Sequence, residues 1–326
     1  MKFGLQLSMR SALVALWAAG VALGPGAGPA SAAATSGPLG AAGPGVVSGT
    51  TAPSGSVDIA SAPTNVAVTP AGRVAYRQVG RGSPLVLIMG FGGTMDDWAP
   101  SFVDRLGAHF RVVVLDNAGV GETAALGPPL TITAMANQVS ALITSLHLGR
   151  TAVLGWSMGG MTAQALAVLH PSQVSRLVLA STQAGTGKAL PIPPAAAAAA
   201  ARPNPGAVLS VLFPAGQAAA AQAYGESLLE YPGLYLVTPA VKAAQTAAID
   251  KWMAGADAAG RAVGGLHLPT LVADGTMDAL DPVANDRLLA GLIHGAQLAL
   301  YPGAGHAFLF QDENEFVPRV EAFLHG

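Results

Sequence analysis

A serine enclosed by small residues places the strongest constraint on what this chain can fold into. A G-x-S-x-G motif occupies residues 155–159, after an apolar run at 151–154 and before a helical pattern at 161–170. Strand, sharp turn and helix form the context in which such a motif exposes a nucleophilic serine, here Ser157. Glycines two positions to either side let neighbouring chain pass close to the strained turn. Because the motif is short, its interpretation depends on a base, an acid and an oxyanion site elsewhere.

The first 32 residues have the pattern of a secretory signal peptide. Two basic residues precede an apolar stretch at 12–23, and small residues at 30–32 or 32–34 offer a cleavage site. About a dozen apolar residues fall short of the roughly 20 that span a bilayer. We therefore expect a secreted, extracellular protein, cleaved near residue 32 and without a stable membrane anchor.

Composition separates a linker from a folded domain. Residues 33–62 consist largely of Gly, Ala, Ser, Pro and Thr. Such a segment cannot bury enough apolar surface to offset the entropy of ordering it, so we expect a disordered linker there and a folded domain over 63–326. The chain contains no cysteine, which excludes disulfides and thiol nucleophiles. Its net charge of −2, without Lys/Arg clusters, predicts no nucleic-acid partner.

Apolar strands alternate with helical segments through most of this domain. Strand patterns occur at 65–69, 73–79, 84–89, 111–115, 151–154, 176–180, 270–273 and 297–301. Helical periodicity follows at 98–110, 131–148, 282–293 and 314–324. This alternation predicts an α/β fold with a mostly parallel sheet and helices on both faces. It breaks at 183–265, where helical segments around 216–230 and 239–253, without a convincing buried strand, predict a helical cap over the carboxyl edge of the sheet.

Candidate partners for Ser157 follow the last strands of the predicted sheet. His306 comes just after the strand at 297–301, in a glycine-rich turn, and is the expected base. Asp278 follows the strand at 270–273 and is the expected acid that orients the imidazole. The order Ser157, Asp278, His306 is the one that this architecture requires.

Other residues compete for these roles. Asp274 lies almost inside its strand, and Asp281 precedes Pro282, where it suits a helix cap; their placement favours Asp278 over both. The remaining histidines do not follow a core strand beside a glycine turn, so they are expected to be surface or capping residues: His109, His147, His170, His267, His294 and His325.

Negative charge on a substrate oxygen requires preorganised donors. We expect the backbone N–H groups of Met158, at the start of a helix, and of Phe91, in the glycine-rich turn after the strand at 84–89, to form the oxyanion hole. The turn at 116–121 superficially suggests a phosphate loop, but it lacks the Lys-Ser/Thr ending and a G-x-G-x-x-G pattern. The sequence therefore predicts neither a cofactor nor a metal.

Taken in order, these segments resemble the α/β-hydrolase superfamily, specifically the capped group of serine esterases, proline iminopeptidase-like enzymes and cofactor-free haloperoxidases or perhydrolases. The resemblance covers 64–326 and is carried by residues 75–90, 116–121, 154–160, 275–282 and 303–306. It implies an α/β-hydrolase fold. A serine at the turn argues against the haloalkane dehalogenases and epoxide hydrolases, which resemble this fold but use an aspartate nucleophile.

The chain departs from the family pattern at two positions. Met89 precedes Gly90 where the family usually has His-Gly, and Ala118 replaces the arginine of the family's Asp-x-Arg-Gly-x-Gly turn. Both residues are usually part of the scaffold. We therefore expect altered anchoring of these loops and retained catalysis.

The sequence thus predicts a serine hydrolase that cleaves small carboxylic esters through an acyl-enzyme. Apolar residues of the insertion favour a hydrophobic acyl or aromatic substrate: Leu209, Phe213, Leu228, Tyr231, Leu234, Tyr235, Trp252 and Met253. The same triad serves perhydrolysis or halogenation through a peracid, and hydrolysis of amides or C–C bonds. A non-catalytic binding protein on a hydrolase scaffold also fits the fold, although such proteins typically lack a triad member.

Overall fold

Within the described residues, eight strands form one sheet whose spatial order is β1-β2-β4-β3-β5-β6-β7-β8. Strands β1 and β2 form an antiparallel hairpin, β2 pairs antiparallel with β4, and all the other pairs are parallel. The strands are β1 (Asn65–Thr69), β2 (Gly72–Val79), β3 (Pro84–Ile88), β4 (Arg111–Leu115), β5 (Thr151–Trp156), β6 (Val174–Ala180), β7 (Thr270–Gly275) and β8 (Gln297–Tyr301). The mostly parallel α/β sheet predicted from the sequence is confirmed.

Our computed structural model describes residues 57–202, 204–233 and 236–326, which belong to a unit that runs from Val57 to Gly326. The predicted signal peptide at 1–32 and most of the predicted linker lie outside the described residues. The last six residues of that linker, 57–62, are described and differ from the expectation. Ile59 is fully buried in the core, and its backbone N–H donates to Asp104 Oδ1 at 2.8 Å. One large apolar side chain is enough to attach this otherwise small and polar segment to the domain.

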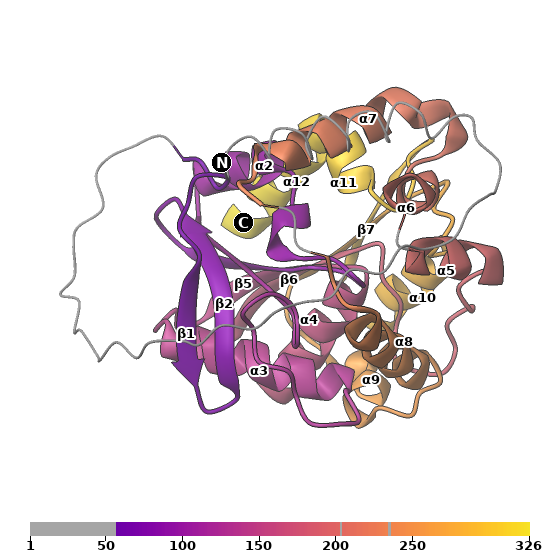
Figure 1. The fold of residues 1–326 in the computed structure, drawn as a ribbon. Coiled ribbons are helices and arrows are strands. Elements are labelled where there is room, and N and C mark those ends of the chain that lie inside the picture. Colours follow the sequence, from indigo (N-terminus) through magenta and orange to yellow (C-terminus); the bar gives the residue numbers. More distant parts are fainter. Residues whose placement is uncertain (1–56, 203, 234–235) are drawn as a thin grey trace, which may run out of the picture. The chain divides into compact units, whose positions relative to one another are not determined.

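Helices cover both faces of the sheet, as Figure 1 shows. One hydrophobic core lies under α2 (Pro100–Gly107), α11 (Phe308–Gln311) and α12 (Glu313–His325). The core on the opposite face lies under α3 (Ile132–Ser145), α4 (Met158–Leu169) and α10 (Ala284–Leu292). The central strands contribute side chains to both cores, which explains why they are continuously apolar in sequence.

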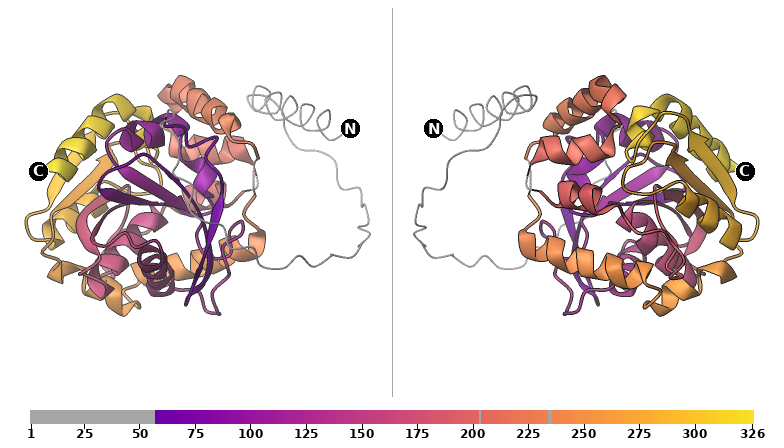
Figure 2. Two further views of the ribbon diagram at one scale, coloured as in Figure 1. Left: turned by 90° about the vertical axis from the view of Figure 1, so that its left-hand side faces the viewer. Right: turned by 90° about the vertical axis from the view of Figure 1, so that its right-hand side faces the viewer.

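Between β6 and β7 the described chain is helical. Its helices are α5 (Pro194–Ala201), α6 (Pro205–Leu212), α7 (Ala218–Ser227), α8 (Pro239–Met253) and α9 (Ala258–Arg261), with 3-10 turns η2 (Ala215–Gln217), η3 (Leu228–Glu230) and η4 (Val263–Gly265). In Figure 2 this insertion, coloured from pink to orange, lies along one side of the molecule. Tyr224 of α7 packs into one core and Trp252 of α8 into the other.

The helix expected at 98–110 is shorter than its pattern. A 3-10 turn, η1 (Met95–Asp97), precedes it, and Thr94 and Asp97 form a reciprocal cap around that turn. Helix α2 then begins at Pro100, because proline is favoured in a first helical turn. No helix within the described ranges is long and apolar enough to cross a bilayer.

Candidate active site

Ser157 occupies a strained turn between β5 and α4. Its backbone has φ 56° and ψ −120°, a conformation that costs a non-glycine residue about 1–3 kcal/mol. The turn is held by hydrogen bonds to the end of β6 and the chain that follows it: the Ser157 N–H donates to the Ala180 carbonyl at 2.9 Å, and Thr182 Oγ1 donates to the Ser157 carbonyl at 2.7 Å. A methyl group on Gly159 would overlap the carbonyl oxygen of Ile88. The glycine therefore lets α4 cross the end of β3.

His306 and Asp278 are in direct contact. Nδ1 of His306 lies 2.6 Å from Oδ2 of Asp278, and both side chains are almost completely buried. The other carboxylate oxygen, Oδ1, accepts the backbone N–H groups of Leu280 and Asp281 at 2.7 and 2.8 Å. A carboxylate held in this way keeps the proton of a neutral imidazole on Nδ1 and leaves Nε2 free to accept another. The structure thus brings His306 against Asp278, and not against Asp274 or Asp281.

The backbone of His306 is attached to the strand ends beside Ser157. Its carbonyl accepts the indole N–H of Trp156 at 2.9 Å and the hydroxyl of Ser181 at 3.0 Å. Because Trp156 immediately precedes Ser157, the three predicted triad residues gather at one edge of the sheet. In the described part of the chain the Ser157 hydroxyl donates no hydrogen bond to His306. Catalytic hydrogen bonds are often long in ligand-free structures and tighten when substrate binds.

The two predicted oxyanion donors belong to the chain segments next to this serine. Met158 is the first residue of α4, where backbone N–H groups lack helical partners and the helix dipole favours negative charge. The turn after β3 passes close by, since a methyl group on Gly90 would lie 3.2 Å from Cβ of Ser157. Among the described residues, the backbone N–H groups of Phe91 and Met158 donate to no acceptor. Both groups are therefore available to a ligand.

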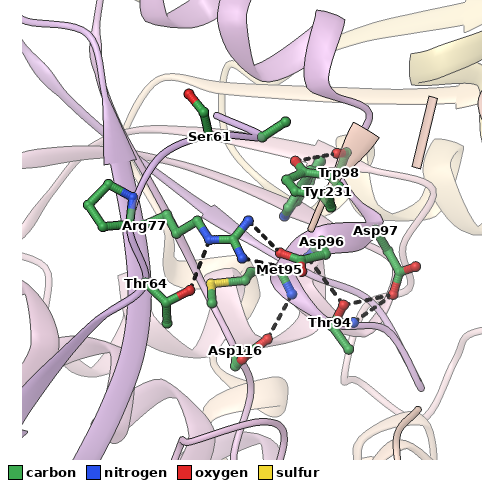
Figure 3. Close-up of polar contacts among 12 residues, drawn as sticks. Ser61, Thr64, Arg77, Thr94, Met95, Asp96, Asp97, Trp98, Asp116 and Tyr231 are labelled. Carbon is green, nitrogen blue, oxygen red and sulfur yellow. Dashed lines mark hydrogen bonds and ion pairs between the residues drawn. The ribbon is translucent and has the colours of Figure 1, made fainter. Parts of the chain in front are cut away.

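The loop after β3 is anchored by residues of the loop after β4. Asn117 donates from Nδ2 to the Met89 carbonyl at 2.8 Å, and Asp116 Oδ1 accepts the Met95 N–H at 2.8 Å. A buried ion pair follows, in which Arg77 Nη1 lies 2.8 Å from Asp96 Oδ1 (Figure 3). Burial raises the pKa of Asp116 to about 6. These contacts anchor the loops in a chain that has Ala118 in place of the family's arginine.

A cluster of three buried aspartates lies beside the catalytic candidates. One carboxylate oxygen each from Asp274, Asp281 and Asp286 lies within 4.8 Å of the others. Burial, followed by repulsion from neighbouring carboxylates, raises the pKa of all three, that of Asp281 to about 7. Four of their carboxylate oxygens have no hydrogen-bond partner among the described residues, namely Oδ2 of Asp274, Oδ2 of Asp281 and both oxygens of Asp286. A group of oxygens this close together could hold a small cation, which the prediction of no metal site did not anticipate.

Sequence reasoning missed several residues that support this site. Ser181 bridges the His306 carbonyl and Asp274 Oδ1, to which its hydroxyl lies at 2.7 Å. Gln245 of α8 accepts the backbone N–H of Gly92 at 2.8 Å. Ser181 could have been found, since it follows a buried strand at the same sheet edge. Gln245 carried no sequence signal, because nothing in its helix indicates which loop the helix contacts.

Four of the eight apolar residues expected to contact substrate are packing residues. Phe213, Leu228, Tyr231 and Trp252 are buried in the two cores, and Leu234 and Tyr235 lie outside the described residues. A separate cavity of about 590 Å³ is lined by residues 58 and 60–64 together with Arg77, Glu230 and Pro232. None of the predicted site residues lines it.

The chain is similar to known hydrolases. The family profile described as alpha/beta hydrolase fold matches residues 83–313. A putative carbamate hydrolase RutD of Caulobacter sp. (strain K31) is 28% identical over 267 residues, covering 74% of this chain and 90% of that protein. A putative non-heme bromoperoxidase BpoC of Mycobacterium tuberculosis (strain ATCC 25618 / H37Rv) is 38% identical over 111 residues, covering 34% and 42%.

Several of the more identical matches span only about two fifths of the relative's length. Among solved structures, the enol-lactonase from Burkholderia xenovorans LB400 has a TM-score of 0.64 and 28% identity, covering 80% of this chain and 100% of that one.

Proposed function

This chain belongs to the alpha/beta-hydrolase fold family, and from that premise we propose that it is a secreted serine hydrolase that cleaves carboxylic esters. The observation that carries the proposal is the 2.6 Å contact between His306 Nδ1 and Asp278 Oδ2, at the sheet edge where Ser157 sits on a strained turn. Backbone strain at a partly exposed polar residue is characteristic of functional sites, because the strain lowers the stability of the fold.

The proposed reaction proceeds through an acyl-enzyme. Ser157 Oγ attacks the acyl carbon while His306 Nε2 accepts its proton, and Asp278 stabilises the imidazolium that forms. The N–H groups of Phe91 and Met158 hold the negative oxygen of the tetrahedral intermediate. His306 then returns the proton to the departing alcohol, and water, activated by the same histidine, releases the acid. The absence of an acceptor for either N–H group among the described residues supports this arrangement.

The substrate we propose is a small ester. Support comes from the similar enol-lactonase, whose name implies cleavage of a lactone, which is a cyclic ester. An apolar acyl group remains part of the proposal. Its support is reduced to Leu209 and Met253, which are only partly buried although they also pack against the cores.

A fluorophosphonate label, located by mass spectrometry, tests the mechanism together with a series of nitrophenyl esters of graded chain length. Wild-type protein should be labelled at Ser157 and should turn over at least one ester, whereas Ser157→Ala should be neither labelled nor active. Labelling of a different serine, or equal turnover by the variant, would reject the mechanism. The chain length with the highest kcat/KM defines the acyl preference.

A second candidate activity is perhydrolysis. The similarity to a putative non-heme bromoperoxidase favours it over hydrolysis of amides or C–C bonds. In this reaction hydrogen peroxide replaces water at the acyl-enzyme and forms a peracid, which oxidises halide. Bromination of a phenol indicator in acetate and peroxide, absent in Ser157→Ala, would support this activity.

Secretion is tested separately. Full-length protein expressed with its own N-terminus should be recovered from the culture medium, and its N-terminal sequence should begin at residue 33 or 35. Recovery of an intact N-terminus from the cell fraction would contradict the proposal.

A further inference from the structure

Helix α8 of the insertion packs directly on two glycine turns, one after β3 and one after β4. A methyl group on Gly92 would lie 3.0 Å from Lys242 Cε, and one on Gly119 would lie 3.0 Å from Val241 Cγ2. Both glycines have positive φ, at 67° and 78°. One face of the helix thus contacts the turn after β3, which carries the predicted oxyanion donor Phe91, and the turn after β4.

Gln245, on the same face of α8, makes the polar contact between helix and turn. Its Oε1 accepts the backbone N–H of Gly92 at 2.8 Å, and the residue is completely buried. Only the oxygen of a carboxamide can accept this bond, which fixes the orientation of the group. Nε2 then has no acceptor among the described residues. A buried polar group without a partner costs about 1–3 kcal/mol, so stability alone does not favour glutamine at this position.

The turn that Gln245 holds has little rigidity of its own. Gly90, Gly92 and Gly93 surround Phe91, and glycine imposes the weakest restriction on backbone dihedral angles. An oxyanion hole stabilises a transition state only when its donors are already oriented. A hydrogen bond to the N–H of Gly92 fixes the peptide plane that follows Phe91, and therefore limits the directions in which the Phe91 N–H can point.

We propose that Gln245 is a positioning residue, which uses helix α8 of the insertion to hold the oxyanion turn in its working conformation. The inference rests on the proposed function, because it assumes that the Phe91 N–H binds the substrate oxygen. It assigns to α8 a role in the chemical step that is independent of the acyl group, since every ester presents the same carbonyl oxygen to the turn.

Gln245→Met tests the role by removing the acceptor at similar volume. We expect kcat to fall about tenfold with KM changed less than twofold, by the same factor for every nitrophenyl ester in the series, because a looser donor affects the transition state and not substrate binding. The rate of fluorophosphonate labelling should fall by that factor too. The matched control is Gln222→Met, which changes an exposed glutamine of α7 and should leave kcat unaltered.

A second variant separates positioning from folding. Gln245→Glu retains an acceptor for Gly92 but adds a charge when ionised, so its kcat relative to wild type should rise as the pH falls and the carboxyl group becomes protonated. The inference would be overturned if Gln245→Met left kcat unaltered or changed only KM. It would also be overturned if the kcat of Gln245→Glu relative to wild type did not vary with pH. A wild-type protein that is neither labelled nor active would instead overturn the proposed function.

Discussion

Three aspartates near the end of β7 show how strongly the surroundings of a residue decide its chemistry. Asp278 contacts His306 and receives two backbone N–H groups. Asp274, within the strand, has its Oδ1 2.7 Å from the Ser181 hydroxyl oxygen, and Oδ1 of Asp281 accepts an N–H from Nδ2 of Asn285 at 2.8 Å. Their spacing in the chain is only a few residues, yet one is arranged to orient a base while the other two are buried beside it.

Asp278→Asn should lower kcat for ester hydrolysis by about 10³–10⁴-fold with the fold retained, because an amide no longer selects the imidazole tautomer that accepts the serine proton. Steady-state kinetics and circular dichroism measure the two quantities. Asp281→Asn is the comparison, since Asp281 makes no hydrogen bond to His306, and it should keep most of the activity. A larger loss in Asp281→Asn would show that Asp278 is not the acid of the triad.

Asp281 also predicts a dependence of stability on pH. Burial raises its pKa from 3.8 to about 7, so the folded state disfavours the ionised carboxyl and this residue's contribution to stability is lost as the pH rises through that range. Asp281→Asn cannot ionise, and we expect its free energy of unfolding relative to wild type to increase from pH 4 to pH 8. Urea denaturation at several pH values measures this difference. Asp250→Asn, at an exposed position of α8, should show no such trend.

At the scale of elements, the serine turn exists because β5 and α4 can approach β3 and one another closely. A methyl group on Gly155 would overlap the carbonyl of Gly159, and one on Gly159 would overlap that of Ile88. The spacing of the glycines is therefore a packing requirement as much as a catalytic one.

Gly159→Ala should destabilise the fold by about 3 kcal/mol although alanine is the better helix former, because the added methyl forces α4 away from β3. Gly291→Ala is the matched change in α10, where a methyl group would have no neighbour within 4 Å. It should stabilise the protein by about 0.5–1 kcal/mol. Chemical denaturation measures the change in the free energy of unfolding for both variants. The packing argument predicts changes of opposite sign, and equal changes would contradict it.

At the scale of the whole molecule, segments far apart in the chain meet at the site. The residues after β3, β5, β6, β7 and β8 converge there, and the insertion contacts two of the loops. Helix α8 contacts the turn at Gly92, and a methyl group on Gly305, next to His306, would lie 2.6 Å from the carbonyl of Leu212 at the end of α6. Movement of the insertion would therefore alter the positions of both the oxyanion turn and the base.

Residues 57–62, at the N-terminal edge of the domain, provide a test of where the folded domain begins. Ile59 is fully buried although it lies in the segment expected to be a linker. Ile59→Ala should cost about 2–4 kcal/mol, as for other large-to-small changes in a core. Val68→Ala, at an 80% exposed position of β1, should cost less than about 1 kcal/mol. Similar thermal stabilities for the two variants would show that residues 57–62 are not part of the folded domain.

Much of the fold could be predicted because its signals are local. Continuous apolar runs predicted the buried strands to within a few residues of their observed ends. The helical segment expected at 239–253 agrees with α8. The helix at 98–110 was too long because its apolar spacing continues past both observed ends, whereas Pro100 and the Thr94 cap determine where the chain becomes helical. The predicted end of the linker at residue 62 was wrong, because the composition of the segment does not indicate that Ile59 is buried in the core.

The sheet, the serine turn and the edge at which candidate residues accumulate could be read from the chain, because periodicity and glycine spacing act over a few residues and the edge follows from parallel topology. Sequence placement also favoured Asp278, and the folded structure supplies its contact with His306. Folding alone shows that Ser181 and Trp156 hold the His306 carbonyl and that Gln245 reaches the oxyanion turn. These contacts join residues about 30 to 150 positions apart. Their geometry depends on how helices and loops pack against the sheet, and no local pattern encodes that packing.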